Sequence, residues 1–222
     1  MRVLAISGHP DDETLGCGGV LLRHRADGDE VYWVIATQAT EPRWQAETVR
    51  HKATEVERVA QAYAMSDVHR LGFPAAMLDV MPHAEVVEAL RGVVAKVRPD
   101  VVYVVHGGDI HTDHRIVFDA SIAVLKSHYM KRLGVTRVVS YETLSSTDAA
   151  PPLADRTFAP SIYRDVTEYL EQKLAIMAMY ESELQPFPMP RALESVRALA
   201  RCRGATVGVA YAEAFMLIRE LT

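Results

Sequence analysis

The sequence has very little cysteine and no long apolar run. Cys17 and Cys202 are its only cysteines, too few for the disulfide framework of a small secreted domain, so we expect a reduced, cytoplasmic protein. No apolar stretch approaches the roughly 20 residues that a membrane-spanning helix needs. The short apolar run after Arg2 leads into polar residues without a cleavage region, so we expect neither a signal peptide nor a membrane span.

An excess of positive charge is also missing. Lys and Arg number 24 against 29 Asp and Glu, which gives a net charge of −5 and a pI near 6.0. A nucleic-acid-binding surface is normally basic, so nucleic acid is not an expected partner. The chain is 49% hydrophobic and 24% charged, which is ordinary for a globular protein. Its length fits one domain over residues 1–222.

Apolar strand-like runs alternate with amphipathic segments along most of the chain. Strands are expected at Val3–Ser7, Val31–Ala36, Val68–Leu71, Val101–Val105 and Arg137–Tyr141, with Ala212–Ile218 as a last strand or packed tail. Helices are expected at Thr14–Ala26, Ala46–Met65, Pro82–Val97, Arg115–Lys131, Glu168–Glu181 and Ala192–Cys202. Ser145–Pro160 is expected to be a loop, and Gly204–Gly208 to end the last helix. This order predicts an α/β fold with a mostly parallel sheet sandwiched between helices.

A histidine and three carboxylates directly follow the first expected strand, in the sequence His9-Pro10-Asp11-Asp12-Glu13. Open α/β sheets bind their ligands at the carboxyl ends of the strands, which is where these residues fall. Histidine and carboxylate ligands without a thiolate suit zinc or another borderline divalent metal. An N-capping turn made by Asp12 explains one carboxylate, but not a histidine beside three.

A second polar segment follows the expected strand Val101–Val105, in the sequence His106-Gly107-Gly108-Asp109-Ile110-His111-Thr112-Asp113-His114. The first and fourth strands of such a sheet lie side by side where the strand order reverses, so the two segments are expected to meet. His9, Asp12 and His114 are then the expected ligands of a hydrolytic metal, leaving one position for water.

The remaining polar residues of these segments have catalytic roles in this hypothesis. Asp11 is expected to be the general base for a metal-bound water. His111 is expected to carry a proton to the leaving group or to stabilise the oxyanion. Asp113 is expected to orient His111.

The two motifs together resemble those of the LmbE-like, or PIG-L, de-N-acetylase family. The resemblance continues through Leu15-Gly16-Cys17-Gly18-Gly19, Arg50 with Glu55, Leu71-Gly72 and Tyr211-Ala212-Glu213-Ala214-Phe215. It implies a Rossmann-like fold, the ligands and base already named, and zinc (or another divalent metal such as Fe²⁺). It also implies hydrolysis of the acetamide of an N-acetylglucosamine-type sugar conjugate. It assigns Arg50 to the substrate and His111 to the tetrahedral intermediate.

The sequence departs from the family pattern in places. Thr37-Gln38-Ala39-Thr40 replaces a Thr-acidic/amide-Gly segment, and Asp109 stands where some members have tyrosine. We expect Asp109, and Asp79 in the loop after Leu71-Gly72, to contact the substrate together with Arg50.

Two other functions remain open from the sequence. A metal phosphoesterase also uses His/Asp clusters, usually with two metals. A Rossmann-like module that binds a sugar or nucleotide without chemistry is the other alternative. Family members are often oligomeric, so a homo-oligomer is possible.

Overall fold

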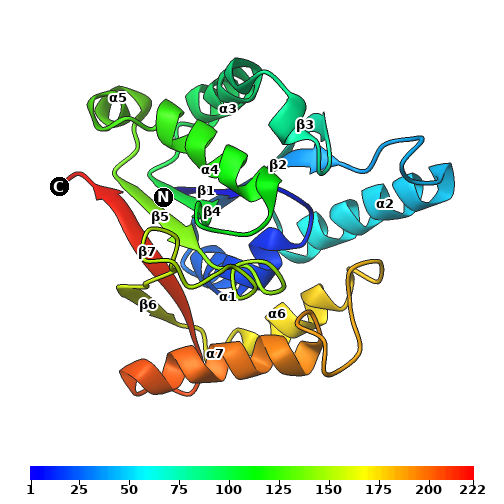
Figure 1. Cartoon of the computed structure of the whole chain (residues 1–222). Coiled ribbons are helices and arrows are strands. Elements are labelled where there is room, and N and C mark those ends of the chain that lie inside the picture. Colours follow the sequence, from blue (N-terminus) through cyan, green and yellow to red (C-terminus); the bar gives the residue numbers. More distant parts are fainter.

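In the computed structural model, which describes residues 1–222, the strands form one seven-stranded sheet of order β3-β2-β1-β4-β5-β7-β6 (Figure 1). The strands are β1 (Arg2–Ser7), β2 (Glu30–Gln38), β3 (Asp67–Pro74), β4 (Val101–Val105), β5 (Arg137–Tyr141), β6 (Ile162–Asp165) and β7 (Ala212–Glu220). The first five are parallel, whereas β7 pairs antiparallel with both β5 and β6. The predicted mostly parallel α/β fold is therefore confirmed.

Helices cover both faces of this sheet. They are α1 (Asp12–Ala26), α2 (Ala46–Ala62), α3 (His83–Val97), α4 (Thr112–Val124), α5 (Ser127–Leu133), α6 (Leu170–Met177) and α7 (Leu193–Val207), with a 3-10 turn, η1 (Leu78–Val80). Figure 1 shows α1, α6 and α7 on one side of the sheet and α3 and α4 on the other, with α2 extending past its edge. None of these helices has the length and apolar character to cross a bilayer.

The strand order reverses at β1, which lies between β2 and β4. In the register, Val3 pairs with Val31 on one side and Val101 on the other, and Ile6 pairs with Val34 and Val104. The loops that follow β1 and β4 therefore leave the same edge of the sheet side by side, as predicted.

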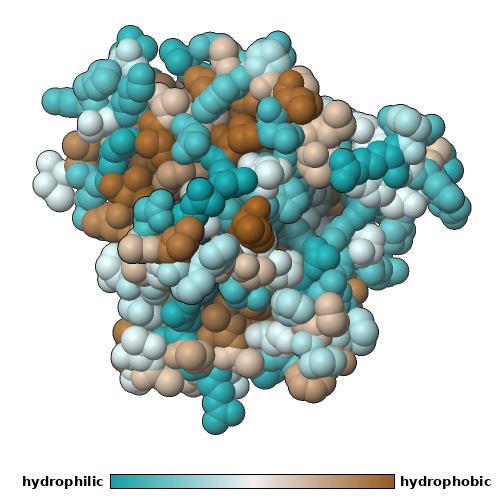
Figure 2. Space-filling model, viewed as in Figure 1, coloured by the Kyte–Doolittle hydropathy of each residue, from teal (hydrophilic) through white to brown (hydrophobic).

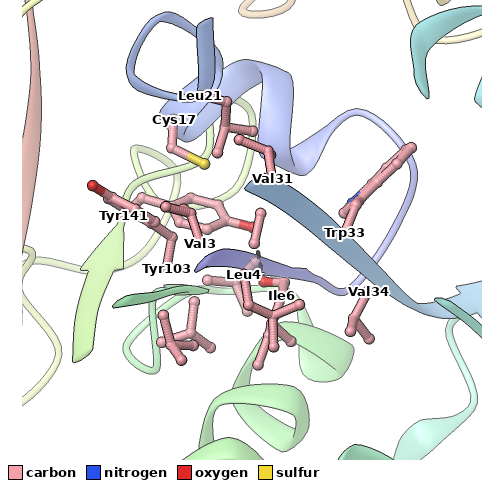
Figure 3. Packing of buried hydrophobic residues seen from close by; sticks show 14 of the residues in the cluster. Val3, Leu4, Ile6, Cys17, Leu21, Val31, Trp33, Val34, Tyr103 and Tyr141 are labelled. Atoms are coloured by element: carbon pink, nitrogen blue, oxygen red, sulfur yellow. Dashed lines mark hydrogen bonds between the residues drawn. The ribbon is translucent and has the colours of Figure 1, made fainter. Parts of the chain in front are cut away.

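The core under α1 is packed closely. Figure 3 shows Cys17 and Leu21 of α1 directed at the apolar side chains of the central strands. Gly16 allows this approach, because a Cβ there would lie 2.0 Å from Cδ2 of Tyr141 and 2.7 Å from the carbonyl oxygen of Glu142. Small residues in α1 thus hold the helix, and the site at its N-terminus, against the sheet.

A buried ion pair joins α1 to β7 and α6. The Glu213 carboxylate accepts hydrogen bonds from the backbone N–H groups of Gly19 and Val20, both at 2.8 Å. Lys173 donates to Glu213 at 2.7 Å and to the carbonyl of Leu15 at 2.9 Å. Both charged side chains are almost completely buried. Because each is paired and hydrogen-bonded, they connect three elements without leaving a charge unsatisfied.

The prediction of one continuous helix over Arg115–Lys131 is wrong. α4 ends at Val124, and α5 starts only at Ser127. Leu125 is fully buried between them, and its carbonyl accepts a hydrogen bond from Arg219 of β7 at 2.6 Å. Lys126 is extended, with φ −55° and ψ 139°. This tertiary contact satisfies a carbonyl at the end of the first helix, so the chain changes direction without losing a hydrogen bond.

Two C-terminal features also differ from expectation. α7 continues through Gly204 to Val207, and the left-handed Gly208 ends it. A Cβ at position 204 would lie 2.7 Å from the carbonyl oxygen of Val209, so this glycine serves packing inside the helix. The short strand β6 was not predicted, since four partly exposed residues give no strong pattern. Ala212–Ile218 lies within β7, which resolves the alternative between strand and tail.

Candidate active site

The loops after β1 and β4 bring three expected ligand residues together. His9 Nδ1 lies 3.1 Å from His114 Nε2, and Asp12 Oδ2 lies 3.2 Å from the same nitrogen. The third side of the triangle, from His9 Nδ1 to Asp12 Oδ2, measures 3.7 Å. Asp12 and His114 are buried, whereas the side chain of His9 is 19% exposed.

This triangle has the dimensions of a metal site. Two ligand atoms bound at about 2.1 Å to a tetrahedral zinc ion lie about 3.4 Å apart, close to all three observed separations. One carboxylate oxygen and two imidazole nitrogens are also the donor types that zinc accepts. Without a metal, the protonated His114 Nε2 donates a hydrogen bond to His9 Nδ1 at 3.1 Å, and a metal ion would take the place of that proton. The residues present therefore fit a divalent metal.

The surroundings of His114 favour a positive charge. Its Nδ1 lies 3.1 Å from Asp109 Oδ2, while its Nε2 faces Asp12. Burial lowers the pKa of His114, but the charges of Asp12 and Asp109 outweigh it and raise the pKa to about 10. In the chain alone a proton supplies this charge, and a divalent cation would take its place.

The carboxylate of Asp113 contacts a different histidine from the one expected. Its Oδ2 lies 2.9 Å from Nε2 of His9, one of the expected ligands, and not from the ring of His111. The same carboxylate accepts hydrogen bonds from the N–H groups of Ala76, at 2.6 Å, and Leu78, at 3.1 Å. A carboxylate on the second nitrogen of a ligating histidine fixes the ring and its tautomer.

His111 stands at the start of α4, within 4.8 Å of the nitrogens of His9 and His114. Its Nδ1 accepts a hydrogen bond from the Asp113 N–H at 3.2 Å, which caps the helix. Burial and the neighbouring charges of His9 and His114 lower the pKa of His111 to about 4. A neutral ring that accepts at Nδ1 carries its proton on Nε2, so it presents a donor.

Asp11 lies beside the triangle in an unusual backbone conformation. Its φ is 101°, a left-handed value that is uncommon outside glycine, and its side chain makes no helix cap. Its N–H donates to Oε2 of Glu13 at 3.3 Å. Burial, with the charges of Asp12 and Glu183, raises the pKa of Asp11 well above its usual value, against the opposing effect of Arg191. A carboxylate with a raised pKa is a suitable proton acceptor near neutral pH.

A cavity of about 480 Å³ opens above these residues. His9, Asp11, Asp12, His111 and His114 all line it. Its far wall carries apolar side chains of α2 and of the segment before it, namely Trp44, Val49, Ala53 and Val56. Figure 2 shows the surface hollowed beside α2, with hydrophilic and hydrophobic residues at the edge of the hollow. Its volume and mixed lining are those of a small-molecule site.

The three residues expected to contact substrate lie outside this cavity lining. Arg50 and Asp79 are exposed, on α2 and η1. Asp109 is 1% exposed and is engaged by His114, by the His111 N–H at 2.8 Å, and by the hydroxyls of Ser146 and Thr147. Asp109 therefore connects His114, one of the expected ligands, to the loop after β5.

Four other charged residues that line the cavity were missed from the sequence. They are Lys52 of α2, Arg70 of β3, and Glu183 and Arg191 of the segment between α6 and α7. Lys52 stands three residues before the buried Glu55, and that spacing places both on one face of the helix. Its helical spacing from Glu55 is thus the one signal by which the sequence could have identified Lys52. No local pattern distinguished Glu183 or Arg191.

Comparison with known proteins gives a consistent result. A family model described as PIG-L, GlcNAc-PI de-N-acetylase, matches residues 4–125, which is more than half of the 222 residues. An uncharacterised deacetylase of Escherichia coli (strain K12), YaiS, is 26% identical over 189 residues, covering 81% of this chain and 90% of that protein.

Solved structures share the whole architecture. The conserved protein TT1542 from Thermus thermophilus has a TM-score of 0.78 at 25% identity, over 99% of this chain and 96% of that one. An N,N'-diacetylchitobiose deacetylase from Pyrococcus horikoshii has a TM-score of 0.77 at 22% identity, over 98% of this chain and 84% of that one. Because this second protein is only 22% identical, its similarity establishes a common fold and no common function.

Proposed function

Since the chain belongs to the PIG-L family of de-N-acetylases, as the sequence motifs predicted, we propose that it is a zinc-dependent N-deacetylase of an N-acetylglucosamine-type sugar conjugate. The family match and the deacetylase YaiS support the reaction class. The sugar is supported by the description of the family model. We also place the protein in the cytoplasm, which its two separate free cysteines support.

The observation that carries the proposal is the triangle of His9, Asp12 and His114 with Asp11 beside it, at the base of the cavity. His9, Asp12 and His114 would hold a divalent metal there, and this metal would lower the pKa of water to about 7 and polarise a carbonyl.

The residues of the chain supply the proton transfers. Asp11 accepts the proton of the attacking water at its carboxylate, since it lines the cavity without belonging to the triangle. His111 presents its Nε2–H to the cavity, where it stabilises the negative oxygen that forms from the acetamide carbonyl. When the C–N bond breaks, the proton held by Asp11 passes to the leaving nitrogen, so that the amine of the sugar conjugate and acetate are the products.

Acetate release tests the proposal. The protein is stripped with a chelator, reloaded with zinc or Fe²⁺, and incubated with a panel of N-acetylglucosaminyl conjugates. Acetate that appears only after metal is restored supports the proposal, and the ranking of the metals identifies the better cofactor. Phosphate released from phosphate esters with two metals per chain would indicate the phosphoesterase instead. Tight sugar binding that ignores the chelator would indicate a binding module.

Substitutions at the site separate the base from the ligands. Asp11→Asn is expected to lower kcat by about 10²–10⁴-fold, the usual contribution of a general base, while one metal per chain remains bound. His9→Ala is expected to lose both metal and turnover, because it removes a corner of the triangle. Elemental analysis measures the metal content of each variant, and the acetate assay measures its turnover. Full turnover by Asp11→Asn would remove Asp11 from the role of base.

A further inference from the structure

Arg191 connects the expected base to the opposite wall of the cavity. Its Nη1 lies 3.3 Å from Asp11 Oδ2 and 2.9 Å from Glu183 Oε2, so one nitrogen serves two carboxylates. The side chain is 25% exposed and lines the cavity. Its Nε is buried and has no hydrogen-bond acceptor, which is costly for a cationic side chain. Arg191 therefore makes its side-chain hydrogen bonds at the cavity through Nη1 alone.

Asp11 needs such a contact. Its left-handed backbone is reached directly after Pro10, and its side chain does not bond to the helix that it precedes. Its neighbour Asp12 is fixed by the metal triangle, but the Asp11 carboxylate has no other hydrogen-bond donor than Arg191. The position of the carboxylate therefore depends on the guanidinium.

The segment that ends at Arg191 is rich in proline. The segment from Gln185 to Arg191 contains Pro186, Pro188 and Pro190, which restrict its backbone. The two ends of this segment hydrogen-bond to each other: Gln185 N–H donates to the Arg191 carbonyl at 3.4 Å, and Arg191 N–H donates to Gln185 Oε1 at 3.3 Å. Because the prolines already restrict the unfolded segment, holding Arg191 in place costs little conformational entropy on folding.

Glu183 connects Arg191 to α2. In addition to its contact with Arg191, Glu183 accepts a hydrogen bond from Lys52 of α2, and Lys52 also donates to the Ser182 hydroxyl at 3.0 Å. The neighbouring Ser182 is bound through its N–H and hydroxyl to the buried Glu55, at 2.8 and 2.7 Å. The segment that carries Arg191 is thus fastened to α2 by two residues of one helix face.

We propose that Arg191 is a positioning residue that holds the Asp11 carboxylate in its catalytic orientation, with Glu183 and Lys52 holding Arg191 in turn. This inference rests on the proposed function for its catalytic meaning, because Asp11 is the general base only in that reaction. Arg191 acts through Asp11 and does not contact the reacting atoms. No sequence pattern links the two residues, which are separated by 180 positions.

Kinetics of Arg191→Gln test the proposal. We expect kcat to fall about 10–100-fold, the scale of a misplacement near 1 Å, with KM and the metal dissociation constant each within twofold of wild type. Arg191→Lys is expected to recover part of kcat, since an ammonium can still reach one carboxylate. Arg201→Gln, an exposed arginine of α7, is the control and is expected to leave all three values unchanged. A rise in KM with unchanged kcat would overturn the proposal, because it would make Arg191 a substrate contact.

The Asp11→Asn background shows whether Arg191 acts through Asp11. If it does, adding Arg191→Gln to Asp11→Asn changes the residual rate less than twofold, because the group to be positioned is already lost. A full, multiplicative loss in the double variant would overturn the proposal.

A crystal structure of Arg191→Gln gives an answer that does not depend on turnover. We expect the Asp11 carboxylate to rotate away from its wild-type position or to become disordered, with His9, Asp12 and His114 unmoved. An unchanged, well-ordered Asp11 would overturn the positioning role. If the wild-type protein released no acetate from any conjugate, the proposed function would fail, and this structure would still decide whether Arg191 positions Asp11.

Discussion

Asp113 shows at the scale of one residue how the proposed metal site is arranged. Its carboxylate joins His9 Nε2 to the backbone N–H groups of Ala76 and Leu78, so the ring of this expected ligand is anchored to the chain around η1. The other nitrogen of the ring is then left unprotonated toward His114 and Asp12. A ring held in this way needs no reorientation when a cation arrives.

Substitution of Asp113 is therefore expected to weaken the metal without removing a ligand. In Asp113→Asn the dissociation constant of zinc should rise about 10–100-fold, as for other carboxylates behind a ligating histidine. Competition with a chromogenic chelator measures it. Asp119→Asn, an exposed carboxylate on the same helix, is the control. Equal zinc affinity in the two variants would show that Asp113 does not hold His9.

The residues of the triangle were predictable because each stands within a few positions of the end of a strand, in two dense polar segments. The partner of Asp113 was not predictable, because sequence adjacency to His111 says nothing about which ring nitrogen faces it. The same applies to Arg191, whose contact with Asp11 exists only after distant segments have packed. The resemblance assigned Arg50 to the substrate, whereas the helix residue that lines the cavity is Lys52, two positions further on and about 200° around the helix.

At the scale of elements, α1 carries the site at its N-terminus and is fitted to the sheet by Gly16. Gly16→Ala is expected to destabilise the protein by about 1–3 kcal/mol, because its Cβ would overlap the ring of Tyr141 and the backbone of Glu142. Gly92→Ala in α3 is the matched control. A Cβ there meets nothing within 4 Å, so a gain of about 0.5–1 kcal/mol is expected. Chemical denaturation gives both values, and equal effects would refute the packing role of Gly16.

The buried Glu213–Lys173 ion pair connects α1 to β7 and α6. Glu213→Gln is expected to cost about 3–5 kcal/mol, since it leaves the buried Lys173 ammonium without its counter-charge. Glu220→Gln of the same strand, which breaks a half-exposed pair with Arg137, is expected to cost at most about 1 kcal/mol. Urea unfolding followed by circular dichroism measures the difference. A small effect of Glu213→Gln would mean that Lys173 finds another acceptor.

Elements with a strong internal pattern were predicted well, and elements decided by distant contacts were not. β4 consists of five buried, mostly β-branched residues, and its prediction matches the strand residue for residue. The division between α4 and α5 depends on Arg219, nearly 100 positions later. Gly204 has the composition of a helix end but packs within α7 against the chain that returns to β7.

At the scale of the whole molecule, the proposed metal is expected to act as a fold stabiliser. It would join the segments after β1 and β4 and would bind only where both are folded, so zinc at 100 times its dissociation constant should add about 2.7 kcal/mol to the free energy of unfolding. Thermal unfolding of stripped and reloaded protein measures this. His114→Ala should unfold at the same temperature with and without zinc. A shift of equal size in that variant would place the bound zinc elsewhere.

The strand order has one more consequence, which concerns the order in which a ribosome delivers the parts of the site. His9 and Asp12 emerge first, but they stay an incomplete pair until His114 follows, 105 positions after His9. The central parallel strands β2, β1 and β4 have been synthesised by then, so the expected metal ligands all lie within the first 114 of the 222 residues. Arg191 is made much later, together with the segment that closes over Asp11. All three expected metal ligands are thus synthesised before Arg191, the residue proposed to hold the base in position.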